Sequence, residues 1–256
     1  MTADRALQPL GPIAVTGASS GIGEAVAQVL DAAGVTVIGL DRQPPNRPVA
    51  RGVYMALDVT HEDEVESTIA AIESDVGPLA GLVNAAGILG KVHRPERLRL
   101  ADWDRELRVD LTGTWICARA VGPRMAARGG GSIVNVASVA GMTASPAHAY
   151  SAAKAGVISL TRTLARAWGR QGVRVNAVSP GFTQTPALAK GVEAGVLDAS
   201  RIAEATALGR LLEASEIADA IVWLLSAGSR GVTGINLPVD GGFLAGATWS
   251  AYGAET

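Results

Sequence analysis

Residues 12–23 read PIAVTGASSGIG, a short apolar run followed at once by a glycine-rich turn. The run is typical of a buried strand, and the pattern that follows it is typical of a helix. Glycines between a strand and a helix allow a tight turn and let a pyrophosphate approach the backbone amides. Glycine can also serve packing there, and the spacing G-x-x-x-G-x-G differs from the common G-x-G-x-x-G fingerprint. In its strand–turn–helix context, the stretch predicts a dinucleotide site.

The same alternation of short apolar runs and longer helical patterns continues along the chain. Strands are predicted at Pro12–Thr16, Val35–Leu40, Val53–Leu57, Gly81–Asn84, Ser132–Ala137, Val173–Val178 and Ile235–Val239. Helices are predicted at Gly21–Ala33, Glu62–Ser74, Ala101–Arg128, Ala149–Arg170 and Ser215–Ser226. Continuous apolar strands between helices are typical of a sheet covered on both faces. We therefore predict an α/β fold, a single doubly wound Rossmann-type domain whose mostly parallel seven-stranded sheet carries helices on both faces.

Two regions depart from the alternation. Residues 41–52 carry three prolines and leave no room for a crossover helix. Residues 182–213 contain loosely helical pieces, and we expect a substrate lid there, with a simple surface excursion as the alternative. We expect residues 1–10 to be an N-terminal extension and residues 11–256 to form one dinucleotide-binding catalytic domain.

Composition excludes several classes of protein. The chain has 256 residues, 48% of them hydrophobic, and a net charge of −2, which argues against disorder and against binding nucleic acid or anionic membranes. Cys117 is the single cysteine and the three histidines are scattered, so neither a disulfide nor a metal site is expected. The N-terminus does not resemble a signal peptide, and no apolar run is long enough to span a membrane. We expect a cytoplasmic protein without metal.

Asp41 ends the second predicted strand. An acidic side chain about 20 residues beyond the glycines can bind both adenosine ribose hydroxyls and repel a 2′-phosphate. Asp41 therefore favours NAD over NADP. Two alternatives stay open, because the residue could simply form a turn and the neighbouring Arg42 offers a phosphate a cationic partner.

Tyr150 and Lys154 are four residues apart at a predicted helix start, which places both side chains on one face. An ammonium near a phenol favours the phenolate and makes the tyrosine usable as an acid or base near neutral pH. Ser138, 12 residues earlier, could hold a substrate carbonyl. A tyrosine that packs over a lysine stem, and a serine that caps a turn, are the alternatives.

With these motifs together, the chain resembles a classical short-chain dehydrogenase/reductase from about residue 11 to 242. The motifs are TGASSGIG at 16–23, Asp58-Val59, NAAG at 84–87, Ser138, Tyr150-x-x-x-Lys154, Asn176 and Ser179-Pro180-Gly181. They occur in the family's order and at about its spacing.

The resemblance implies a role for each matching residue. Tyr150 is the expected general acid or base, Lys154 its partner and a ligand of the nicotinamide ribose, and Ser138 the contact of the substrate oxygen. Asp58 and Val59 are expected at the adenine, residues 84–87 along the adenosine, and residues 180–185 at the nicotinamide carboxamide and diphosphate. The implied cofactor site comprises Gly17, Ser19, Ser20, Gly21, Ile22, Gly23, Asp41, Arg42, Asp58, Val59, Asn84, Ala85, Ala86, Gly87, Tyr150, Lys154, Pro180, Gly181, Thr183 and Thr185.

The chain departs from the family pattern at two places. Asp110 occupies a position where the family usually has an asparagine that supports a proton-relay water, partly through its backbone carbonyl. We expect Asp110 to remain catalytic, because the carbonyl is retained, and its carboxylate to strengthen the relay or pair with Lys154. Ser138 and Tyr150 are also one residue closer together than in many relatives.

The sequence thus predicts an NAD(H)-dependent oxidoreductase that interconverts a secondary alcohol and its ketone. Candidate pocket residues are mostly apolar, namely Ala140, Met142, Ala144, Phe182, Leu188 and Leu197, so we expect an uncharged or weakly polar substrate. The alternatives are an NADPH-dependent 3-oxoacyl-thioester reductase, a non-catalytic nucleotide sensor and a methyltransferase. The resemblance implies a homotetramer, in which the apolar tail residues Phe243, Leu244, Trp249 and Tyr252 either pack on a neighbouring subunit or stay disordered.

Overall fold

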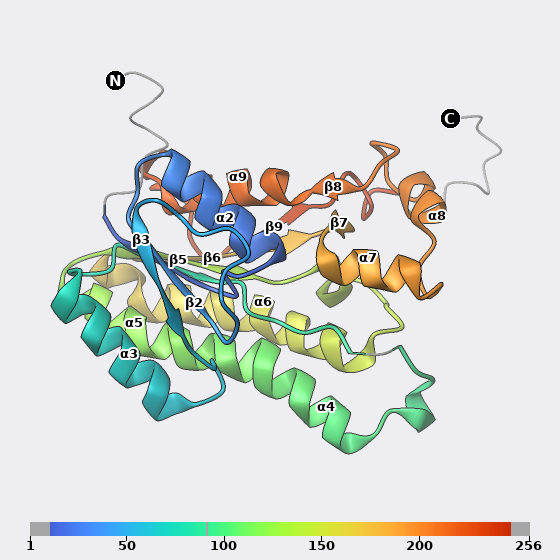
Figure 1. The fold of residues 1–256 in the computed structure, drawn as a ribbon, viewed down its shortest axis with the longest axis horizontal. Coiled ribbons are helices and arrows are strands. Elements are labelled where there is room, and N and C mark those ends of the chain that lie inside the picture. The colour runs from blue at the N-terminus through green and yellow to red at the C-terminus, as the bar shows by residue number, and fades with distance from the viewer. Residues whose placement is uncertain (1–10, 91, 247–256) are drawn as a thin grey trace.

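The computed structural model describes residues 11–90 and 92–246 (Figure 1). Seven strands are β1 (Ile13–Thr16), β2 (Val37–Asp41), β3 (Gly52–Ala56), β4 (Gly81–Asn84), β5 (Gly131–Val136), β6 (Val173–Pro180) and β9 (Asn236–Val239). They form one sheet in the order β3-β2-β1-β4-β5-β6-β9, and every neighbouring pair is parallel. The chain winds outward in both directions from β1 and β4, so the predicted doubly wound α/β fold is confirmed.

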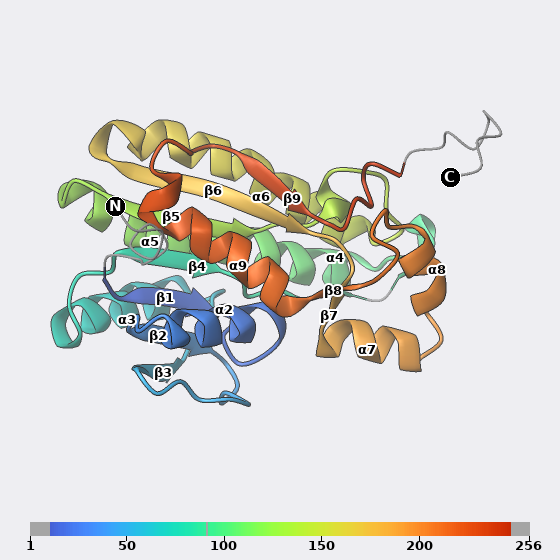
Figure 2. The same ribbon diagram turned by 90° about the horizontal axis from the view of Figure 1, so that it is seen from above.

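Helices cover both faces of the sheet. They are α2 (Gly21–Ala32), α3 (Glu62–Asp75), α4 (Leu100–Leu107), α5 (Thr114–Ala127), α6 (His148–Trp168), α7 (Pro186–Glu193), α8 (Ala199–Glu204) and α9 (Ala214–Leu225). Figures 1 and 2 show α2 and α9 on one face of the sheet and α3, α5 and α6 on the other. As predicted, no helix lies between β2 and β3.

The two faces divide the core into two clusters. Leu82 and Ile133 face α3, α5 and α6, whereas Val83 and Val134, one residue later on the same strands, face α2 and α9. Successive strand residues point to opposite faces, so a sheet buried on both sides needs apolar residues at every position. The continuous apolar runs in the sequence have this cause.

The prediction of one continuous helix at Ala101–Arg128 is wrong. The expected helix Ala101–Arg128 is in fact α4, a π-helical turn at Arg108–Gly113, and α5. A π turn inserts an extra residue, which changes the side chains that face inward and is often found at functional sites. In this chain it carries Asp110, which is fully buried.

A chain of polar side chains links the sheet to α6 on the face that α3, α5 and α6 cover. The Asn84 amide on β4 donates to Asn135 Oδ1 on β5 at 2.9 Å, and the Asn135 amide donates to Thr161 Oγ1 on α6, also at 2.9 Å. All three residues are buried. Each hydrogen bond offsets the cost of burying these polar groups.

The region 182–213 stands beside the carboxyl edge of the sheet, where Figure 2 shows α7 and α8. Its two ends are joined by a short parallel pair, β7 (Thr183–Gln184) and β8 (Leu212–Glu213). Thr185 caps α7 by accepting the Leu188 N–H, and Asp198 caps α8. The loosely helical pieces expected within residues 182–213 thus correspond to α7 and α8, whereas no sequence pattern indicated the strand pair.

Within the described residues, no helix combines the length and the apolar character that crossing a membrane would require.

Candidate functional site

A cleft of about 510 Å³ runs along the carboxyl edge of the sheet. It brings together most of the residues selected from the sequence. Those in its wall are Gly17, Ser20, Gly21, Ile22, Gly23, Asp41, Arg42, Asp58, Val59, Ala85, Ala86, Gly87, Ser138, Tyr150, Lys154, Pro180, Gly181, Thr183 and Thr185. Ligands of doubly wound sheets bind at this edge, where the strand order reverses.

The glycine turn fits a pyrophosphate by its backbone shape. Gly17 has φ +69°, and a Cβ on it would lie 2.7 Å from the Ala86 nitrogen. A Cβ on Gly23 would lie 2.1 Å from the Gly17 carbonyl oxygen, so any side chain at either position would force the turn apart. Ser20 makes no side-chain cap to α2, which leaves the first amides of that helix available to an anion.

Asp41 lies at the end of β2 and its carboxylate organises the neighbouring loop. Asp41 Oδ2 accepts the Ser19 N–H at 3.1 Å, and Oδ1 accepts the Gln43 N–H at 3.0 Å. Arg42 does not stand alone beside it, because its guanidinium is 3.5 Å from Asp58 Oδ2. Burial raises the pKa of Asp58, but hydrogen bonds from Thr60 and the Arg42 charge outweigh this and hold the pKa below its usual range.

Three residues selected from the sequence stand behind the wall of the cleft. Ser19 is buried and its hydroxyl donates to the Gln43 carbonyl. The Asn84 amide donates to Asn135 in the polar chain described above, and Asp110 lies behind Lys154. Both the Ser19 and Asn84 side chains are turned into the protein, so a cofactor contact from either residue stays a prediction.

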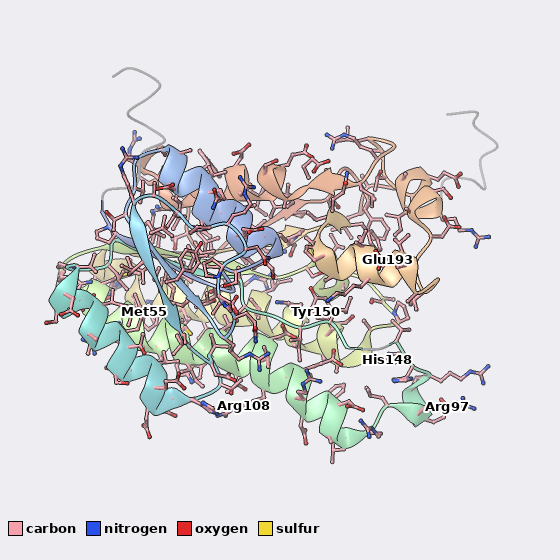
Figure 3. The ribbon with its side chains drawn as sticks, in the orientation of Figure 1. Met55, Arg97, Arg108, His148, Tyr150 and Glu193 are labelled. Atoms are coloured by element: carbon pink, nitrogen blue, oxygen red, sulfur yellow. The ribbon has the colours of Figure 1, made fainter. Side chains whose placement is uncertain are left out.

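Tyr150 and Lys154 project from the first turns of α6. Figure 3 shows Tyr150 and His148 near the start of this helix, on the side of the molecule where α7 also lies. The Lys154 nitrogen is 5.4 Å from the centre of the Tyr150 ring and donates to the Val136 carbonyl at 2.9 Å. Lys154 is 4% exposed, so its charge acts on the ring with little screening by water.

Ser138 follows β5 and lines the same cleft. Its Oγ accepts the Ala140 N–H at 3.1 Å, which fixes the side chain and leaves the hydroxyl proton free to be donated. Ser138, Tyr150 and Lys154 thus come together as the sequence predicted, and the short spacing between Ser138 and Tyr150 still places both in one wall.

Asp110 faces Lys154 from the π turn. Its Oδ1 accepts the Ile88 N–H at 2.9 Å and is 3.7 Å from Lys154 Nζ. Burial raises the pKa of Asp110 above its usual range, while the Lys154 charge and the Ile88 N–H act against that rise. The backbone carbonyl that was expected to support a water accepts the Thr114 hydroxyl at 2.8 Å.

The far end of the cleft is apolar. Ala140, Phe182, Leu188 and Leu197 line it as expected, whereas Met142 and Ala144 do not. Met142 is 44% exposed. Phe182 meets the Phe243 ring edge to face at 5.4 Å, so a tail residue supports this wall. Trp249 and Tyr252 of the predicted tail, like residues 1–10, lie outside the described residues.

Sequence reasoning missed several residues near this end. Leu89 and Val92, from the segment after β4, also line the cleft, and no periodic pattern marks them because they belong to no helix or strand. Glu106, which does not line the cleft, was missed too; it is 5% exposed, and burial raises its pKa while the Gly90 N–H opposes that rise. Its position four residues before Asp110 on a helical pattern was the one available signal.

Within residues 11–90 and 92–246, no group of three or more His, Cys, Asp or Glu side chains is placed to hold a metal ion.

Comparison with known proteins identifies the family. The family model described as enoyl-(acyl carrier protein) reductase matches residues 17–244. A cis-4-hydroxycyclohexanecarboxylate dehydrogenase from Sinomonas cyclohexanicum is 39% identical over 240 residues, which are 90% of this chain and 95% of that protein. An uncharacterized short-chain type dehydrogenase/reductase from Sinorhizobium fredii is 38% identical over 94% of this chain, which spans only 45% of that longer protein.

Solved structures agree on the fold. A structure from Brucella melitensis 16M, titled ribose-5-phosphate isomerase, is 46% identical with a TM-score of 0.93 and covers 98% of this chain and 99% of its own. The chain belongs to the classical short-chain dehydrogenase/reductase family. It is an oxidoreductase that interconverts an alcohol and a ketone.

Similar proteins use both nicotinamide cofactors. A protein from Listeria innocua named NAD-dependent glycerol dehydrogenase is 34% identical over 90% of this chain and 92% of its own length. A gluconate 5-dehydrogenase structure from Burkholderia cenocepacia, in complex with NADP and tartrate, is 30% identical with a TM-score of 0.88 and covers 95% of this chain and 99% of its own. The choice of cofactor therefore has to be argued from this chain's own residues.

Proposed function

We propose that this chain is an NAD(H)-dependent dehydrogenase of secondary alcohols, with Tyr150 as the general acid or base. The observation that carries the cofactor preference is Asp41, which lies in the cleft wall at the end of β2. Its negative charge suits two ribose hydroxyls and opposes a 2′-phosphate. Arg42, which could have attracted that phosphate, pairs with Asp58, and the Ser19 hydroxyl is already donated to Gln43.

The residues of the cleft fit a nicotinamide dinucleotide along its whole length. The turn from Gly17 to Gly23 would hold the diphosphate, Asp58 and Val59 the adenine, and residues 85–87 the adenosine side. Pro180, Gly181, Thr183 and Thr185 would hold the nicotinamide end. When bound, the cofactor supplies the carbon that gives or accepts the hydride.

The proton is managed by the chain's own residues. In carbonyl reduction the Tyr150 hydroxyl gives its proton to the carbonyl oxygen, and in alcohol oxidation the Tyr150 phenolate takes the proton of the alcohol. The nearby Lys154 ammonium stabilises that phenolate. Ser138 donates a hydrogen bond to the same substrate oxygen, which aligns it with Tyr150.

The apolar end of the cleft supports a neutral or weakly polar substrate. Among the described residues that line the cleft, the charged ones are Asp41, Arg42, Asp58 and Lys154, all at the cofactor or catalytic positions. A charged substrate group at the far end would therefore lose water without gaining a partner. Residues 182–213 carry part of this wall and are proposed as the lid.

We also propose that the protein acts as a homotetramer in the cytoplasm. The assembly rests on the family resemblance and the compartment on the single buried cysteine, which offers no disulfide. Light scattering on the purified full chain measures the assembly.

The first experiment is a titration of the purified protein with NADH and NADPH, followed by nicotinamide fluorescence. Tighter binding of NADH supports the role of Asp41, and a panel of neutral secondary alcohols with NAD then tests turnover. Tighter binding of NADPH would favour the 3-oxoacyl-thioester reductase. Cofactor binding without turnover of any alcohol or ketone would favour the sensor, and binding of neither cofactor would refute the proposal. One similar structure is titled ribose-5-phosphate isomerase, so an assay with ribose 5-phosphate and no cofactor tests whether this protein has isomerase activity.

A further inference from the structure

Two opposite charges are buried together where the catalytic wall meets the protein interior, Lys154 in the wall and Asp110 behind it. Asp110 has no exposed surface and Lys154 is 4% exposed, with 3.7 Å between Asp110 Oδ1 and Lys154 Nζ. The other carboxylate oxygen, Asp110 Oδ2, is buried and has no hydrogen-bond partner among the described residues. A carboxylate in such a place is costly unless a positive charge offsets it.

The elements packed around Asp110 offer few other charges. From α6 it faces Lys154, with Tyr150 one turn before that lysine, and from α4 the nearest acid is Glu106. Arg108, on the same π turn, donates to the Thr60 carbonyl and is exposed. The segment after β4 contributes only the Ile88 N–H, and α5 contributes the Thr114 hydroxyl to the Asp110 carbonyl.

We propose that Asp110 is a positioning residue that balances the Lys154 charge and so sets the pH at which Tyr150 exchanges its proton. This inference rests on the proposed function. The Lys154 ammonium favours the Tyr150 phenolate, and the Asp110 carboxylate offsets part of that effect. This offset favours the Tyr150 hydroxyl, the form that donates a proton to a ketone.

Asparagine at this position is the sharpest test, because it removes the charge and keeps the shape. Its amide oxygen can still accept the Ile88 N–H, and its amide nitrogen replaces the unpartnered Oδ2. The experiment measures kcat/KM against pH for alcohol oxidation in the wild type and in Asp110→Asn, using a substrate that the wild type turns over. We expect the midpoint of the alkaline rise to fall by ~0.5 to 1 pH unit, with roughly 3- to 10-fold faster oxidation below the midpoint.

The matched control is Glu106→Gln, which removes the other buried carboxylate on the same side and should leave the midpoint in place. A midpoint in Asp110→Asn that is unchanged or raised would overturn the inference, as would an equal shift in Glu106→Gln. Melting curves show whether the variants fold, and Asp110→Ser provides a second neutral variant that should shift the midpoint in the same direction. If neither folds, the role of Asp110 is structural and the inference fails.

The two proposals can fail separately. A wild type without turnover of any alcohol or ketone refutes the proposed function, and this inference with it. A wild type that turns over while Asp110→Asn keeps the same pH profile refutes only the charge balance.

Discussion

The cofactor end of the cleft is walled by backbone, whereas the substrate end is walled by side chains. At the first, Gly17 and Gly23 allow main chains to touch where a Cβ would lie under 3 Å from its neighbours. At the second, Phe182, Leu188 and Leu197 come from the proposed lid, and Phe243 of the tail supports them. Backbone contacts tolerate almost no change, while apolar side chains can be exchanged for others of similar volume. The cofactor end of the cleft therefore tolerates far fewer substitutions than the substrate end.

The largest expected effect falls at the junction of the two ends. Tyr150→Phe removes the hydroxyl that exchanges the proton, so turnover should fall by about 10²-fold or more while NADH binding stays the same. Steady-state rates and fluorescence titration measure the two effects. Tyr54→Phe is the control, since the Tyr54 hydroxyl is buried without a partner among the described residues and its loss should not slow turnover.

Equal turnover in Tyr150→Phe and the wild type would remove Tyr150 from the mechanism. A loss of NADH binding in this variant would show instead that the phenol belongs to the cofactor end.

One added methyl group should disrupt the glycine turn whose backbone lines the cofactor end of the cleft. Gly17→Ala should lower NADH affinity by roughly 10- to 100-fold, because a positive φ and the contact with the Ala86 nitrogen both oppose the side chain. Gly34→Ala is the matched control: its φ is +79°, but a Cβ there would have no neighbour within 4 Å. That variant should lose about 1 kcal/mol of stability and keep its NADH affinity. Similar losses of affinity in both variants would mean that strain matters and the close contact does not.

Asp41→Asn tests which residue at the cofactor end sets the preference for NADH over NADPH. Removing this charge should reduce the preference for NADH over NADPH by about tenfold, since the 2′-phosphate no longer meets a negative group. The ratio of the two dissociation constants measures it. Asp75→Asn removes the same charge from the exposed end of α3 and should leave the ratio unaltered. A ratio unaffected by Asp41→Asn would assign the selectivity to another residue.

The smallest effect is expected at the side-chain wall. Phe182→Ala removes the edge-to-face contact with Phe243, and KM for the alcohol should rise by about threefold with NADH affinity preserved. Initial rates at varied alcohol concentration, with saturating NAD, test this. A weaker NADH affinity in the variant would show that Phe182 serves the cofactor end as well.

The same difference explains how much could be predicted from the sequence. The seven sheet strands lie within two residues of their predicted bounds, because a sheet buried on both faces leaves continuous apolar runs. Gly17, Tyr150 and Lys154 were found because their spacing follows from backbone geometry. The π turn at Asp110 was missed, since the helical pattern on either side of it continues without a break. Leu89 and Val92 were missed because a loop carries no period.

The polar chain from Asn84 through Asn135 to Thr161 has a consequence for folding. Asn84 and Asn135 are direct partners across β4 and β5. If either strand slipped by one residue, its asparagine would turn to the opposite face, among the valines that meet α2 and α9. An amide buried there would lack its partner, which costs about 1 to 3 kcal/mol for each unmet group. The apolar strands of this sheet differ little from one another. The buried asparagines therefore favour the native register of β4 and β5 over a register shifted by one residue.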